Sequence, residues 1–148
     1  YLERSKSGKG LHAWIFFDAP VPAWKARAVA FAMLREAGAI GEDQQLSSFD
    51  RLFPNQDKPS GKGFGNLIAL PYQGKAAEQN HTLFLDPDSG FKTPFPYQPE
   101  ILRTIQRTTE ADLDRIIEAW ALKAGAKPSG GARGHRLTAI WMLPAVPS

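Results

Sequence analysis

A short basic segment, residues 4–12, has the residue types of an anion-binding site. It contains Ser7, Gly8 and Lys9, and His12 stands where the segment passes into an apolar run. Glycine lets backbone N–H groups approach a bound anion, serine offers a hydroxyl group and lysine offers positive charge. The pattern therefore predicts a phosphate-binding turn. The alternative, open at this point, is a solvated basic turn whose lysines contact no ligand.

The segment does not match a Walker phosphate-binding loop, in which Gly, four residues and Gly-Lys-Ser or Gly-Lys-Thr are followed by a helix. Residues 13–17 are instead aromatic and branched, which predicts a buried strand. Strand alternation places His12 on the same face as Trp14 and Phe16. A packing role for a hydrogen-bonded His12 therefore stands beside the ligand-binding role.

A second group of polar residues surrounds Asp50. This carboxylate belongs to a predicted short strand, residues 46–53, and Asn55 and Gln56 lie in the loop that follows. A carboxylate with neighbouring amides suits a divalent cation and the sugar or base of a nucleotide. The structural alternative is a turn in which Asp50 pairs with Arg51.

The charge distribution favours a polyanionic partner for the N-terminal segment. The 18 lysines and arginines against 15 acidic residues give a net charge of +3. Arg4, Lys6 and Lys9 gather within the first ten residues, whereas acidic residues concentrate at residues 110–118. The sequence Ser-Gly-Lys-Gly returns around Lys62. We therefore take Arg4, Lys6 and Lys62 as candidate nucleic-acid contacts.

Several classes of site and protein are excluded by composition. The chain has no cysteine, which excludes disulfides, thiolate metal sites and cysteine nucleophiles. Its three histidines lack His-Glu-x-x-His spacing, and no Gly-x-Ser-x-Gly elbow of a serine hydrolase is present. No apolar run approaches the roughly 20 residues that a membrane-spanning helix needs. We expect a soluble, cytoplasmic protein with no membrane partner.

The remaining pattern predicts one domain of the α+β class, with a mixed sheet flanked by helices. With 43% hydrophobic residues, the 148-residue chain can bury roughly two-thirds of its unfolded surface. We expect strands at residues 12–17, 46–53, 66–70, 82–85 and 136–142, and helices at 20–38, 99–107 and 110–124. The last helix should start at a capping box of Thr109 and Asp112 and end at Gly125, with Trp120 in the core. In the first helix we expect exposed Lys25, Arg27 and Arg35.

Taken in order, the two polar groups resemble motifs of the archaeo-eukaryotic primase superfamily. The likeness is to the primase-like domain of TOTE conflict systems and, more distantly, to the polymerase domain of bacterial ligase D. Residues 7–12 look like the family's Ser-x-Gly-x-His or Ser-Gly-Lys-Gly-x-His motif at the start of a strand, and Phe49 with Asp50 looks like its aspartate motif at a strand end. Residues 63–72 and 83–86 add to the match, which covers the chain from Tyr1 to about residue 86.

The resemblance implies template-directed nucleotidyl transfer with two metal ions, Mg²⁺ or Mn²⁺. The fold it implies is the RRM-like half of a primase-polymerase core, a DNA or RNA primase. His12 and Asp50 would be the catalytic residues, and Asp50 would ligate one metal. The nucleoside triphosphate would be bound by Ser7, Gly8, Lys9, His12, Asn55 and Gln56. DNA or RNA would serve as template and primer, and fused helicase or nuclease domains are expected.

One part of the family pattern is missing from this chain. The first metal motif, an Asp-x-Asp or Asp-x-Glu pair on a strand before the histidine motif, has no counterpart, because only eleven residues precede His12. Since one carboxylate cannot fix two metals, we expect a fragment, residues 1–148, of a longer chain that supplies the other carboxylates. Whether this chain alone is an enzyme is therefore open. The alternative function is a catalytically incomplete nucleic-acid-binding module.

Overall fold

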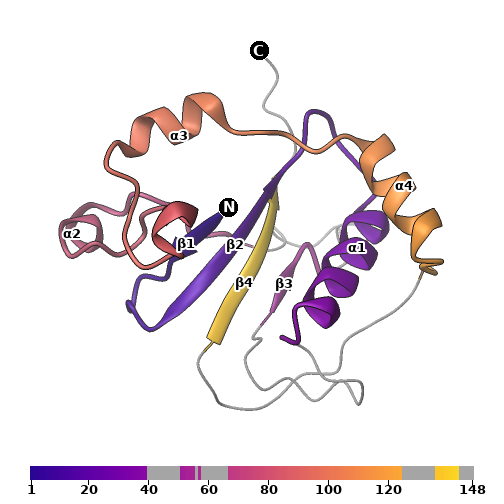
Figure 1. Ribbon diagram of the computed structural model, residues 1–148, viewed down its shortest axis with the longest axis horizontal. Coiled ribbons are helices and arrows are strands. Elements are labelled where there is room, and N and C mark those ends of the chain that lie inside the picture. The colour runs from indigo at the N-terminus through magenta and orange to yellow at the C-terminus, as the bar shows by residue number, and fades with distance from the viewer. Residues whose placement is uncertain (40–50, 56, 58–66, 125–135, 144–148) are drawn as a thin grey trace.

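A four-stranded mixed sheet forms the centre of the molecule (Figure 1). The computed structural model describes residues 1–39, 51–55, 57, 67–124 and 136–143. Its strands are β1 (Leu2–Arg4), β2 (Gly10–Phe16), β3 (Leu52–Phe53) and β4 (Arg136–Leu143), in the order β1-β2-β4-β3. β1 runs antiparallel to β2, whereas β2 and β3 both run parallel to β4. The α+β class with a mixed sheet is confirmed.

Two helices cover one face of the sheet. They are α1 (Ala23–Glu36) and α4 (Glu110–Ala119), which lie side by side in Figure 1. Their apolar side chains form a core with Ala13 and Ile15 of β2. The amine of Lys25 joins the two helices, with 2.6 Å contacts to carboxylate oxygens of Glu110 and Asp114.

The opposite face of the sheet is covered by the chain between residues 68 and 101. This segment contains α2 (Gly74–Glu78), a 3₁₀ turn η1 (Pro87–Ser89) and α3 (Gln98–Thr104). Its core is built around Trp14 of β2, Phe53 and Phe84. The buried amide of Gln98 accepts a hydrogen bond from Phe84 N and donates one to Phe84 O, both 2.8 Å. Gln98 thereby satisfies buried backbone groups of a segment that makes only an isolated bridge to β1.

Most of the expected elements are present, but two expected strands are wrong. Residues 67–70 are irregular, and residues 82–85 form only isolated bridges at Phe84 and Leu85. In the second segment the reason lies in the backbone, since Thr82 has a φ angle of 55°, which interrupts an extended chain at its first residue. Of the expected strand at 46–53, residues 51–53 are described and contain β3, while 46–50 lie outside the described residues.

The end of α4 and the surface of α1 also correct the sequence expectations. α4 ends at Ala119, not at Gly125, and Trp120 is 47% exposed rather than part of the core. Lys25 and Arg27 are not exposed cations. Their side chains are 16% and 17% exposed, because they pair with the acids on α4 and with Asp57 respectively.

Candidate functional site

The predicted phosphate-binding turn is the turn of the β1–β2 hairpin. Ser5 N donates to Gly10 O at 2.8 Å, and the buried Ser5 hydroxyl accepts a bond from Gly10 N at 3.0 Å. The Ser7 hydroxyl accepts from Lys9 N at 3.3 Å and lies 3.2 Å from the Ser5 hydroxyl. These bonds give the turn one defined shape. Its exposed rim carries the side chains of Lys6, Ser7 and Lys9.

Gly8 occupies a position in this turn that another residue would disturb. Its φ angle is 73°, in the left-handed region that favours glycine. A Cβ atom there would lie 2.3 Å from Nε2 of His81. The His81 ring would have to shift, which would disturb the 3.0 Å contact between its Nδ1 and Lys6 O. His81 is thus part of the turn's surroundings, a residue that its sequence position, 73 residues away, did not reveal.

Backbone strain marks the segment that carries His81. Asn80 and Thr82, on either side, have φ angles of 58° and 55°, and such a value is a clear outlier for a β-branched residue. β1 holds the segment in place, since Thr82 N donates to Arg4 O at 2.8 Å and Arg4 N donates to Leu83 O at 3.0 Å. Strained conformations persist where the surrounding structure fixes them, often near functional sites.

Arg4 has a structural role in the same place. Its guanidinium group donates to the carbonyl oxygen of Lys92 at 2.7 Å and to that of Asn80 at 3.4 Å. The side chain therefore ties β1 to two loops. Its part in nucleic-acid binding stays a prediction that would require these bonds to be shared or broken.

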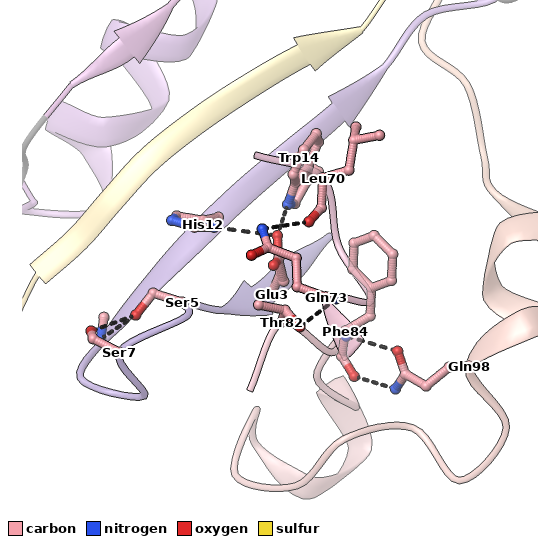
Figure 2. A network of polar contacts seen from close by, with 11 residues as sticks. Glu3, Ser5, Ser7, His12, Trp14, Leu70, Gln73, Thr82, Phe84 and Gln98 are labelled. Atoms are coloured by element: carbon pink, nitrogen blue, oxygen red, sulfur yellow. Dashed lines mark hydrogen bonds and ion pairs between the residues drawn. The ribbon is translucent and has the colours of Figure 1, made fainter. Parts of the chain in front are cut away.

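His12 and the turn are parts of one hairpin, and within this hairpin His12 is paired with an acidic residue, Glu3 (Figure 2). Glu3 on β1 lies directly opposite His12 in the strand register. Its Oε2 is 3.3 Å from His12 Nδ1 and accepts a 2.5 Å bond from Trp14 Nε1. Glu3 is 1% exposed and Trp14 is 1% exposed. Counting back from the hairpin turn would have found this pair.

The pairing of β2 with β4 is irregular next to His12. Leu11 pairs with Leu137 of β4, but His12 pairs with Ala139, so Thr138 has no counterpart in β2. Such a bulge bends a strand locally and re-aims neighbouring side chains. The irregularity coincides with the residue where the turn becomes the buried strand.

The charge of Glu3 is also felt by a tyrosine on the covering segment. Burial, and then the negative charge of Glu3, raise the pKa of Tyr72 to about 12. The phenol donates its proton to the carbonyl oxygen of Gln98 at 2.8 Å. Tyr72 therefore remains neutral at physiological pH and acts as a donor there.

The second polar group can be placed only in part. Asp50, Gln56 and Lys62 lie outside the described residues, and Asn55 is exposed after β3. The register shows where β3 begins. Leu52 and Ala13 both pair with Ile140 of β4, one from each side, so Leu52 and Ala13 stand two strand spacings, about 10 Å, apart.

The described residues do not by themselves make a divalent-cation site. Within that part of the chain, no group of three His, Asp or Glu side chains is arranged to hold a metal ion. Glu3 already serves two partners through one oxygen, and Asp57 is paired with Arg27 at 2.5 Å. No step can therefore be derived through a metal on these residues.

The described domain is thus an α+β domain whose mixed sheet carries a basic Ser-Gly-Lys-Gly turn and a histidine paired with a buried carboxylate. A family model described as "TOTE conflict system, Archaeo-Eukaryotic Primase domain" matches residues 1–116, and the chain belongs to this family. Comparisons with curated proteins and with solved structures gave no match. The helices within the described residues are unsuited to crossing a lipid bilayer, being too short or too polar.

Proposed function

We propose that this chain is the nucleotide-binding half of a primase-polymerase core that performs template-directed nucleotidyl transfer. The observation that carries the proposal is the β1–β2 hairpin. It joins in one rigid unit the basic turn with Ser7, Gly8 and Lys9 and the imidazole of His12, whose Nδ1 faces Glu3. Family membership supports a primase-like nucleotidyltransferase role for that unit.

The residue chemistry suits a nucleoside triphosphate. Lys9 would supply positive charge to the phosphates, the turn around Ser7 and Gly8 would supply polar groups, and His12 would donate to a phosphate oxygen. Asn55 and Gln56 would help to hold the sugar or base. In this proposal the hairpin binds and orients the triphosphate, which is the part of the reaction that the described residues can perform.

The metal part of the reaction belongs to other residues. Two Mg²⁺ or Mn²⁺ ions would activate the attacking hydroxyl and neutralise the leaving pyrophosphate. Asp50 would ligate one of them, together with other carboxylates. Asp50 lies outside the described residues, so its approach to His12 stays a prediction.

Template and primer, DNA or RNA, would approach the exposed basic rim of the turn inside the cell. Lys6 is exposed there, and Lys62 is the other candidate. A second function, a nucleic-acid-binding module without catalysis, is favoured by the missing cation site among the described residues. In that case nucleic-acid binding would require no metal. The logarithm of the association constant would fall linearly with the logarithm of the salt concentration.

Calorimetric titration of the chain with ATP and dATP in the presence of Mn²⁺ tests the proposal. We expect binding that Lys9→Ala and His12→Ala each weaken about tenfold, because each removes a charge-assisted contact. Lys75→Ala, which removes an exposed lysine on α2, is the matched control and should change affinity less than about twofold. Metal-independent binding of single-stranded DNA without nucleotide binding would instead identify the second function.

A further inference from the structure

The most deeply buried charged side chain of the described residues is one that the proposed function has not yet used. Glu3 is 1% exposed, although it lies in a three-residue edge strand of a basic segment. A buried carboxylate is costly unless it is paired and hydrogen-bonded. In the described part of the chain, its ion-pair partner is His12 and its hydrogen-bond partner is Trp14.

Both partners contact the same carboxylate oxygen, and this fixes the geometry. The indole Nε1 of Trp14 can only donate, and a carboxylate can only accept. The 2.5 Å bond from the buried indole therefore anchors Oε2. His12 Nδ1 lies 3.3 Å from that anchored oxygen, so its bond to a carboxylate requires the hydrogen on Nδ1. A ligand contact made by this ring then uses Nε2.

We propose that Glu3 is a positioning residue for the triphosphate, one that acts through His12. It holds the Nδ1 hydrogen, sets the orientation of the ring and presents Nε2 to a phosphate oxygen. When the ring donates from both nitrogens, Nδ1–H to Glu3 and Nε2–H to phosphate, Glu3 carries the compensating negative charge. The inference rests on the proposed function for the identity of the ligand, but the state of the ring can be measured without it.

The affinity test is a double-mutant cycle in the full 148-residue chain. Glu3→Gln keeps the side-chain volume and an acceptor for Trp14 but removes the charge. We expect ATP affinity to fall about tenfold in the otherwise native chain and less than about twofold in the His12→Ala chain. Glu78→Gln, at an exposed position in α2, is the matched control and should leave affinity unchanged. An equal loss in both backgrounds, or no loss, overturns the proposal.

The second measurement is the ring state of His12 in the native chain, read from ¹⁵N nuclear magnetic resonance with His12→Ala for assignment. We expect the hydrogen on Nδ1 without ligand, and a change at Nε2 when ATP is added. A ring with its hydrogen on Nε2 and a bare Nδ1 overturns the proposal. This result decides the matter even where Glu3→Gln fails to fold.

The two proposals fail in different ways. If the native chain binds no nucleotide, the proposed function is wrong, and the ring state still decides whether Glu3 controls His12. If the native chain binds ATP and His12→Ala weakens it while Glu3→Gln has no effect, the proposed function stands and the role of Glu3 is wrong.

Discussion

At the scale of single residues, the contact between Gly8 and His81 is the sharpest steric constraint on the turn. The ring occupies the place where a side chain at position 8 would begin, with 2.3 Å from Nε2 to an ideal Cβ. The same glycine has a φ angle of 73°. Two separate physical causes, a clash and a backbone conformation, therefore exclude other residues from this position.

We expect Gly8→Ala to destabilise the chain by more than the roughly 1 kcal/mol that the left-handed conformation costs alanine. The double variant Gly8→Ala with His81→Ala should recover the steric part of the loss but not the conformational part. Urea unfolding of the native chain, Gly8→Ala, His81→Ala and the double variant measures both parts. Equal losses in the single and double variants would show that the ring does not restrict the turn.

Residue types predicted the turn and the strand position of His12, because both are local properties of the sequence. The prediction that His12 lies on the same strand face as Trp14 was also correct, because side chains alternate along a strand. The role of Glu3 was missed because a carboxylate in a basic segment looks like a solvated charge. The strand register pairs Glu3 with His12, and in the folded chain Glu3 is buried.

At the scale of elements, α1 and α4 end in the same hydrogen-bond pattern with different residues. In α1, Gly38 N donates to Arg35 O and Ala39 N to Leu34 O, both at 2.9 Å. In α4, Ala121 N donates to Glu118 O and Leu122 N to Ile117 O. The left-handed position is Gly38 in α1 and Ala121 in α4, with φ angles of 66° and 49°.

At these two helix ends we expect substitutions to change the stability of the chain in opposite directions. Gly38→Ala should destabilise the chain by about 1 kcal/mol, and Ala121→Gly should stabilise it by a similar amount. A Cβ at Gly38 would meet no atom within 4 Å, so its effect arises from the backbone alone. Thermal unfolding measures both. Destabilisation by Ala121→Gly would show that α4 does not end at this position.

The start of α4 gives a pH-dependent prediction. Bonds from the backbone and hydroxyl of Thr109, and then from Arg115, lower the pKa of Asp112 to about 2. Its stabilising effect is therefore complete above the unfolded value near 4 and is lost as pH falls towards 2. Asp112→Ala should be less stable than the native chain at pH 7, and this difference should shrink by pH 2. Urea unfolding at both pH values checks it, and a constant difference would contradict it.

The two ends of α4 differ in how well the sequence indicates them. The capping box of Thr109 and Asp112 was predicted correctly, because its partners are three residues apart. The end was placed too late because glycine is the usual signal and Ala121 takes its conformation instead. Packing of Leu122 against the core with Ile117 supplies the compensating contact.

At the scale of the whole molecule, the fold depends on a strand beyond the region that the family model matches. The match covers residues 1–116, whereas β4 (Arg136–Leu143) stands between β2 and β3 in the sheet. The strand itself was predicted from its composition, but its central place was not, because strand order depends on contacts far apart in sequence. For the same reason, the contact of residues 80–83 with β1 was not predicted from the sequence.

We expect a chain that stops at Ala124 to lose cooperative unfolding. β2 and β3 would then lack their shared partner, and their backbone groups would need water or new contacts. Circular dichroism during heating, compared with the full chain, checks this. A cooperative transition at the native midpoint would show that the sheet does not need β4.

The central claim is that the β1–β2 hairpin binds a nucleoside triphosphate. The most direct measurement is an amide-resolved magnetic resonance titration of the full chain with ATP and Mg²⁺. The account predicts saturable shifts concentrated at Ser7, Gly8, Lys9 and His12, with α1 and α4 largely unaffected. Saturable shifts confined to the α1 and α4 face, or no saturable shift at all, would contradict it.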